Sequence, residues 1–252
     1  MTVQNTSGTT AFNMDFVEVA EEAWERAGRE MRSGYDLRTA RRSMNLLTIE
    51  WANRGINMWT ITESSIEIPK GTVSIELDPG SINPDSSSIV PFHPTPKVID
   101  IIEQTIRPTT GQESELTLAR VGVSTYANIT NKSATGRPNQ MYVERGVDGV
   151  TGYFWPVPDK SYTLKFWYLR RIEDVRPETP NIATTGNHTP DMPFRFLPCL
   201  VSGLAYYIAM KTPELSGRVM MLKDIYDEQF EMAAAEDRTK VSAKFVPRIG
   251  YV

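Results

Sequence analysis

Apolar residues recur at spacings of three and four between positions 37 and 51, which predicts an amphipathic helix. The repeating residues are Leu37, Ala40, Met44, Leu47 and Trp51. Asp36 stands where the side chain of an N-cap acceptor belongs, and Gly55 stands where a left-handed residue commonly follows a helix. Ile56 comes next and can fold back onto the last turn. The pattern therefore predicts one capped helix with a buried stripe.

Further helices are expected on both sides of the middle of the chain. Asp15 and Glu18 have the spacing of a capping box, so a first helix should begin there. Helical spacing returns from about residue 193 to 233, and Pro213 divides that stretch into two helices. We expect Trp51 to be buried against this C-terminal pair, near Leu204, Ile208 or Leu222.

The apolar period falls to about two after Trp59, which predicts strands. The alternating segments cover residues 61–77, 98–106, 141–143, 152–155 and 162–170. A short helical turn is expected at 124–129, and irregular loops at 83–96 and 176–191. The predicted fold class is α+β: a four-helix bundle from the N- and C-terminal helix pairs, with an inserted β-rich module and an extended C-terminal tail.

We divide the chain into four parts on this basis. Residues 1–12 form a polar mobile arm, 13–58 and 192–237 the helical bundle, 59–191 the β-rich module, and 238–252 the tail. The tail has no acidic residue and no helical period, and Pro247 favours an extended backbone. We expect it to be disordered in the free subunit and to become ordered on a partner, using Lys240, Lys244, Phe245, Val246, Arg248, Ile249 and Tyr251.

Composition narrows the function classes. The chain has 252 residues, 40% of them hydrophobic, and a net charge of −4. No apolar run is long enough to span a membrane, and no secretion signal is visible. A single cysteine, Cys199, excludes an internal disulfide and a cysteine-based metal cluster. Its apolar helical context predicts a buried, unreactive thiol.

Candidate catalytic groups are few. The two histidines, His93 and His188, lie in loops without a second ligand at metal-binding spacing. Glu113 and Glu115 could be imagined as a carboxylate pair, but they follow a turn-like Thr-Gly-Gln stretch that predicts solvated side chains. No nucleotide-binding, hydrolase or metalloprotease motif is present. We therefore expect no enzymatic activity, no metal and no cofactor.

Two basic pairs have two possible interpretations. Arg41 and Arg42, and likewise Arg170 and Arg171, could lie on solvated faces. Their charges would then be balanced by the nearby acids Glu50, Glu173 and Asp174. Alternatively, they could form ion pairs with a neighbouring subunit or a partner. The solvated interpretation is preferred for Arg41 and Arg42. Arg170 and Arg171 remain open, with a subunit interface as their functional interpretation.

Several motifs occur in an order that is typical of one protein family. A helix ending in Trp51 is followed by Asn-Arg-Gly and by Trp59, and GRP and MYV segments follow at 136–138 and 141–143. YFWPVPD occupies residues 153–159, and a predicted strand ends in Tyr-Leu-Arg-Arg at 168–171. Residues 193–209 and 226–237 look like the closing helices of the same family. Together these resemble the head-to-tail adaptors of short-tailed bacteriophages, also called connector or tail tubular protein A, over about residues 15–252.

The resemblance implies a structural role in the virion neck, between the capsid portal and the tail. An adaptor of this kind forms a dodecameric ring under the portal, continues the DNA channel and presents a platform for the next tail component. It implies that the tail residues named above dock on the portal protein, and that Arg170 and Arg171 match a family position. Genomic DNA passes without sequence-specific binding, which suits an acidic chain. Such a protein is made in the host cytoplasm.

A carbohydrate-binding module of a virion is the alternative function. The middle of the chain is rich in aromatic residues, and exposed rings could stack on sugars. The candidate residues are Trp155, Tyr162, Phe166, Trp167 and Tyr168. Strand alternation predicts that most of these rings belong to a packed core, leaving at most one face for a partner.

Overall fold

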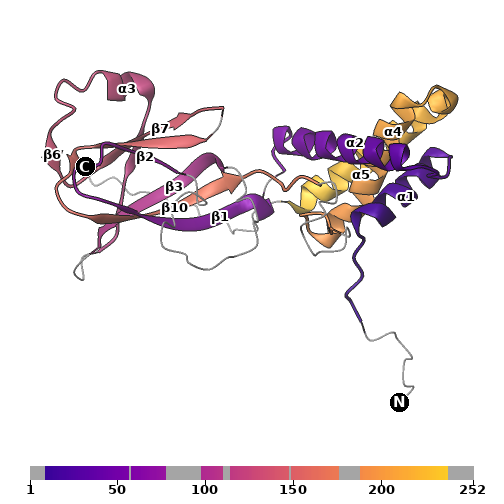
Figure 1. Cartoon of the computed structure of the whole chain (residues 1–252), viewed down its shortest axis with the longest axis horizontal. Coiled ribbons are helices and arrows are strands. Elements are labelled where there is room, and N and C mark those ends of the chain that lie inside the picture. Colours follow the sequence, from indigo (N-terminus) through magenta and orange to yellow (C-terminus); the bar gives the residue numbers. More distant parts are fainter. Residues whose placement is uncertain are drawn as a thin grey trace, which may run out of the picture.

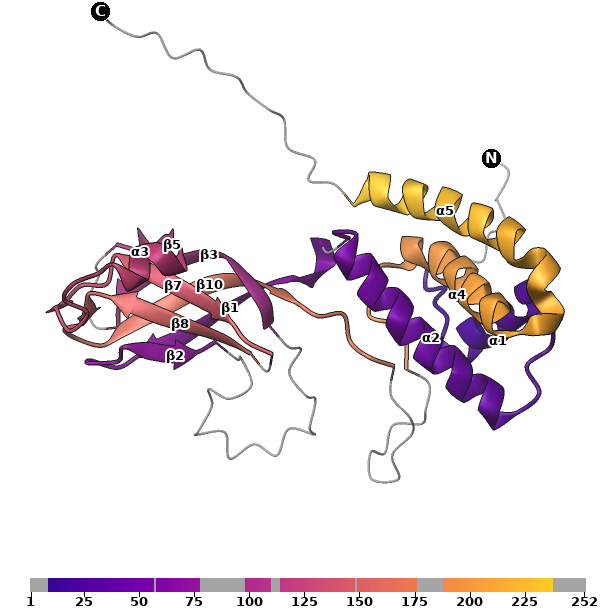
Figure 2. The same ribbon diagram turned by 90° about the horizontal axis from the view of Figure 1, so that it is seen from above.

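The computed structural model places helices and strands in two groups along an elongated molecule (Figure 1). It describes residues 9–56, 58–77, 98–109, 114–147, 149–175 and 188–237. Helices from both ends of the chain lie together, while the strands of its middle lie at the other end (Figures 1 and 2). The predicted α+β class is confirmed. The predicted loop at 83–96 lies outside the described residues, as do most of the polar arm and the loop at 176–191.

The helical group is built around one central helix. Among the described residues its long helices are α1 Phe16–Ala27, α2 Gly34–Asn53, α4 Leu197–Lys211 and α5 Val219–Glu236. Short 3-10 helices are η1 Met58–Thr60, η2 Phe194–Phe196 and η3 Pro213–Arg218. Helix α4 is central because α1, α2 and α5 all pack against it. None of the described helices is long and apolar enough to cross a membrane.

The start of α1 agrees with the sequence, whereas the start of α2 does not. Asp15 accepts a hydrogen bond from the backbone of Glu18 at 2.9 Å, and Glu18 accepts one from the backbone of Asp15 at 3.0 Å, so the capping box is confirmed. Asp36 is not the N-cap of α2. That residue is Ser33, whose hydroxyl accepts from the Asp36 backbone at 3.4 Å. Asp36 is instead buried in the first turn, where its carboxylate accepts from the backbone of Arg32.

The end of α2 has the geometry that the sequence predicts. Gly55 has a φ of 84°, in the left-handed region that favours glycine. The backbone N–H of Ile56 donates to the carbonyl of Trp51 at 3.1 Å, and that of Gly55 donates to Ala52 at 3.1 Å. This pair of bonds is a Schellman motif, and it carries the buried Ile56 side chain back against the helical core.

Trp51 is fully buried against the C-terminal helices, as predicted. Its indole N–H donates to the hydroxyl of Tyr226 on α5 at 3.0 Å. Its ring lies 5.8 Å from that of Phe196 and 6.4 Å from that of Phe230, centroid to centroid. The predicted leucine and isoleucine neighbours belong to the same core. Trp51 therefore links α2 to both C-terminal helices.

Gly203 marks a close approach between helices in this core. A methyl group added at its Cα would lie 2.8 Å from Cε2 of Tyr226 and 2.9 Å from Cδ2 of Leu47. We expect Gly203→Ala to lower the free energy of unfolding by about 1–3 kcal/mol because of overpacking, although alanine favours a helix by about 1 kcal/mol. Denaturant melts would measure the change. Gly217→Ala, with no atom within 4 Å of the added methyl, should change stability by no more than about 0.5 kcal/mol.

The strand group consists of two four-stranded sheets that share one core. The first sheet has the order β1 Ile61–Ile68, β10 Tyr162–Arg170, β3 Val98–Pro108 and β4 Leu116–Thr117. The second has the order β2 Ser74–Glu76, β8 Val150–Trp155, β7 Gln140–Arg145 and β5 Ala119–Val121. A third pair joins β6 Thr135–Gly136 to β9 Val157–Pro158, and α3 Val123–Ala127 follows β5.

Strand β10 shows why these segments pair. Its alternate residues are buried between the sheets, and the intervening ones are partly exposed. It pairs antiparallel with β1 on one side and with β3 on the other. Strand β3 continues to Pro108, past the predicted end at Ile106, because Tyr162 and Thr163 of β10 still pair there.

Candidate functional site

The predicted catalytic candidates do not form a site in the described part of the chain. The backbone carbonyl of His188 accepts from the N–H of Phe16 at 3.0 Å, so this histidine helps to hold the start of α1. Glu115 is exposed, while His93 and Glu113 lie outside the described residues. Within the described ranges, no group of three or more histidine, cysteine, aspartate or glutamate side chains is arranged to hold a metal ion.

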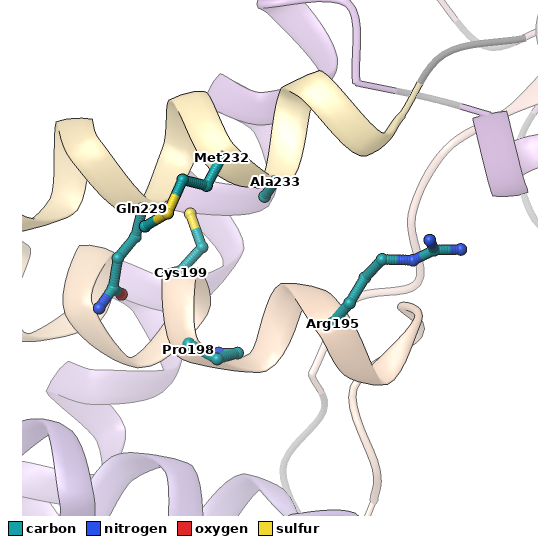
Figure 3. A pocket seen from close by; sticks show the side chains of 6 residues that line it. All are labelled: Arg195, Pro198, Cys199, Gln229, Met232 and Ala233. Carbon is teal, nitrogen blue, oxygen red and sulfur yellow. The ribbon is translucent and has the colours of Figure 1, made fainter.

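Cys199 is buried between α4 and α5, as predicted. Burial raises the pKa of its thiol to about 12, so the reactive thiolate is scarce at neutral pH. The residue lines a hollow of about 220 Å³ beside Gln229, Met232 and Ala233 (Figure 3). Figure 3 shows the side chain of Arg195 directed away from the cysteine. We therefore interpret the hollow as a gap in the packing of α4 against α5.

The aromatic residues predicted for sugar binding do not form an exposed platform. Tyr162, Phe166 and Tyr168 are buried between the sheets. Trp167 is partly exposed on the other face of β10 beneath the ammonium of Lys165, 5.1 Å from the ring centroid. The indole of Trp155 donates to the carbonyl of Asn131 at 3.0 Å. The rings proposed for sugar binding therefore do not share one accessible face.

A different aromatic cluster lies on the outer face of the second sheet. Tyr126 of α3, Tyr142 of β7 and Tyr153 of β8 are partly exposed, with centroid separations of 5.5 to 5.7 Å. The hydroxyl of Tyr153 donates to Glu144 at 2.9 Å, and that hydrogen bond raises the pKa of Tyr153. Sequence reasoning missed this cluster because its members come from three elements. The alternation within β7 and β8 was the only available signal.

Arg170 lies at the junction between the two groups and pairs with Asp191 in the same chain. Both terminal guanidinium nitrogens donate to the carboxylate, one of them at 2.9 Å. The same carboxylate accepts from the backbone of Glu173 at 3.1 Å, and the carbonyl of Asp191 accepts from the indole of Trp59 at 3.0 Å. This arrangement ties the end of β10 to the segments that enter the helices. Asp191 is not one of the acidic partners that the sequence led us to expect for Arg170.

Arg171 is paired differently. It forms a 2.6 Å ion pair with Asp174, one of its predicted partners, and both side chains are 41% exposed. Water weakens such a pair, so its contribution to stability is small. Neither contact tests whether the two arginines also lie at a subunit interface, which stays a prediction.

The Arg170–Asp191 pair gives a prediction about acid stability. Burial raises the pKa of Asp191, but the hydrogen bonds from Arg170 and the Glu173 backbone outweigh it and leave that pKa below its ordinary value of 3.8. The stabilisation is therefore present above about pH 4 and is lost as pH falls through the folded-state pKa. We expect Asp191→Asn to lower the free energy of unfolding at pH 7 by about 1–3 kcal/mol and to flatten its fall below pH 4.

Denaturant melts from pH 2.5 to pH 7 would measure both effects. The matched control is Asp174→Asn, which removes the exposed partner of Arg171 and should change stability by less than about 1 kcal/mol. Equal losses in the two variants would contradict a structural role for the partly buried Arg170–Asp191 pair.

Glu50 does not form an ion pair with Arg41 or Arg42, contrary to expectation. It pairs with Arg54 on the same helix at 2.5 Å, and it accepts from the hydroxyl of Tyr207 on α4 at 2.6 Å. Burial, followed by the hydrogen bond to Glu50, raises the pKa of Tyr207. Arg42 remains exposed on the outer face of α2.

All predicted portal-docking residues lie outside the described residues. The described chain ends at Asp237, just after α5, and Lys240, Lys244, Phe245, Val246, Arg248, Ile249 and Tyr251 follow it in the sequence. Their role in docking therefore stays a prediction, made from the basic and apolar pattern of the tail.

The chain was also compared with known proteins. A comparison with curated proteins found no match. A family described as SU10 adaptor protein matches residues 14–248, a range that includes both structural groups and most of the predicted tail. This is a family of phage head-to-tail adaptors, which are structural proteins of the virion neck and have portal and tail partners. The chain therefore belongs to the SU10 adaptor protein family.

Proposed function

We propose that this protein forms a dodecameric ring beneath the portal, seals the packaged genome and continues the DNA channel toward the tail. The observation that carries this proposal is the family match over residues 14–248, which covers nearly the whole chain. The work is mechanical and needs no catalytic group. The acidic net charge of −4 is compatible with a conduit that does not retain DNA.

The two structural groups support a division of labour in this ring. We assign the helices, as a four-helix bundle of residues 13–58 and 192–237, to the ring wall. The β-rich module, residues 59–191, faces the downstream tail component, and the tail, residues 238–252, docks on the portal. The separate cores of the two groups support this assignment, because each can present its own surface. We assign residues 1–12 to the polar arm. We also propose that the protein is made in the host cytoplasm.

The rings that were predicted to bind carbohydrate do not support that alternative. Its candidate rings are buried or turned to different faces. Glycan retention assays would separate the two functions, because an adaptor should bind portal rings and no sugar.

Electron microscopy of the protein mixed with its portal would test the proposal directly. We expect twelve copies to form a ring on one face of each portal ring, with the strand group pointing away from the portal. A control mixture with a portal-sized ring from an unrelated phage should show no added density. Absence of binding to its own portal, or attachment through the strand group, would contradict the proposal.

A further inference from the structure

The outer face of α2 combines basic and apolar side chains. Residues three or four positions apart lie on one face of a helix, and the exposed residues of α2 have this spacing. They are Tyr35, Arg38, Arg42, Leu46 and Ile49, which we call the α2 face. Leu46 is 53% exposed and Ile49, three residues further along the helix, is 39% exposed, so two large apolar side chains lie next to each other on this face.

The outer face of α5 is also apolar, but its charges are acidic. Met221, Asp224, Ile225, Glu228 and Met232 are exposed and share one face, which we call the α5 face. Met232 is 58% exposed. Methionine adapts to irregular partners and is common at protein interfaces. The α5 face therefore has the composition of a docking surface rather than of a solvated one.

The two faces complement each other. Each has large apolar side chains, and arginines on the α2 face would meet carboxylates on the α5 face. They do not meet within one chain, because each is the exposed side of its helix, opposite the residues that pack in the helical core. Contact between the two faces therefore requires a second copy of the chain.

A pocket beside the α2 face supplies an independent observation. It has a volume of about 530 Å³ and lies between α1, the first half of α2 and the end of α4. Trp24 and Thr39 line it, and the buried indole N–H of Trp24 and hydroxyl of Thr39 have no hydrogen-bond partner among the described residues. These residues are 3% and 9% exposed. Unpaired buried polar groups are costly, so a partner supplied from outside would stabilise them.

The charges around the pocket favour an anionic partner. Arg29, Arg42 and Lys211 line it, against the two acids Asp36 and Glu214. Burial, followed by the charge of Arg42, lowers the pKa of Lys211, so an added carboxylate would relieve a crowding of cations. Arg42 belongs to both the pocket and the α2 face, which makes the two one continuous surface.

We propose that the α2 face and its pocket bind the α5 face of a second copy, with an α5 carboxylate entering the pocket beside Arg42. The inference deepens the proposed ring function by naming the surfaces through which neighbouring subunits meet. Because the two surfaces are different parts of the chain, the contact is head-to-tail, and its repetition closes into a ring when the rotation allows.

Charge reversal tests which faces meet. One variant carries Arg38→Glu and Arg42→Glu, and the other carries Asp224→Arg and Glu228→Arg. Each alone should reduce multimers by roughly tenfold or more, because about 1.4 kcal/mol changes an association constant tenfold. An equal mixture should restore assembly, since each reversed face then finds its complement. Arg107→Glu, at an exposed position of strand β3, is the control and should assemble like the unchanged protein.

Cysteine cross-linking without portal separates this inference from the proposed function. Leu46→Cys and Ile225→Cys are placed together in one chain or separately in two, and the concentrated protein is oxidised. The double variant should give a ladder of multimers, a mixture of the two single variants should give dimers, and each single variant should stay monomeric. The unchanged protein, whose only thiol is the buried Cys199, sets the background.

Each result of the cross-linking and charge-reversal experiments either supports or overturns the proposed interface. No cross-linking above background in the double variant, or efficient dimers from either single variant, would overturn the inference. If the ladder forms but the protein does not bind portal, the proposed function fails and the interface stands. If rings form normally on portal with both charge-reversal variants, the proposed function stands and the interface is wrong.

Discussion

Trp51→Ala should lower the free energy of unfolding by about 3–5 kcal/mol, which is a large part of the stability of a typical domain. The side chain is fully buried, and it fills the space between α2, α5 and the segment entering α4. Its removal leaves a cavity and also takes away the donor to the hydroxyl of Tyr226. Denaturant melts monitored by far-ultraviolet circular dichroism would measure the loss.

Two controls separate packing from hydrogen bonding in that result. Trp51→Phe keeps most of the buried ring but removes the indole donor, and it should cost about 1–2 kcal/mol. Trp155→Ala removes a partly exposed tryptophan in the strand group and should cost less than Trp51→Ala. A loss below about 1 kcal/mol in Trp51→Ala would mean that this helix stripe is not a principal part of the core.

Deleting the residues after Asp237 should abolish portal binding and leave the melting temperature nearly unchanged. Among the described residues, the helical core reaches along α5 to Ala233, so truncation after Asp237 removes none of the described core residues. The deleted segment contains every residue that we assign to portal docking. Pull-down of the truncated chain with portal rings and a thermal melt would test the two parts of the prediction.

Substitutions within the tail would show which interaction dominates. Replacing Lys240, Lys244 and Arg248 with glutamine should weaken binding mainly at low salt, because salt screens exposed charges. Phe245→Ala with Ile249→Ala should weaken it at all salt concentrations. A truncated chain that assembles on portal with unchanged affinity would show that docking occurs elsewhere.

Local signals in the sequence correctly predicted several features of the fold. The Asp15 capping box, the left-handed Gly55 and the burial of Trp51 all follow from residues within a few positions of one another. Such features depend on backbone preferences and on the helical period, which the chain carries locally. The α+β class followed from the change of period after Trp59 and its return near residue 193.

The error at the start of α2 came from a local signal that was overlooked. Ser33 and Asp36 are both good N-cap residues, but Ser33 followed by an acid three residues later has the spacing of a capping box, which favours Ser33. The folded chain uses Ser33 because Asp36 is drawn into the first turn, where its carboxylate accepts from the backbone of Arg32. Both hydrogen bonds span only three or four residues, so the choice between the two N-caps was made locally.

By itself, the sequence determined the helical and strand periods, the aromatic core positions and the order of motifs that indicates a phage adaptor. Tertiary structure decided the long-range partners: Asp191 for Arg170, Glu50 for Tyr207, and the meeting of Tyr126, Tyr142 and Tyr153. It also decided which helix faces remain exposed once α4 is covered. The physical reason is that periodicity fixes which residues share a face, whereas the choice of neighbour for that face depends on how distant segments pack.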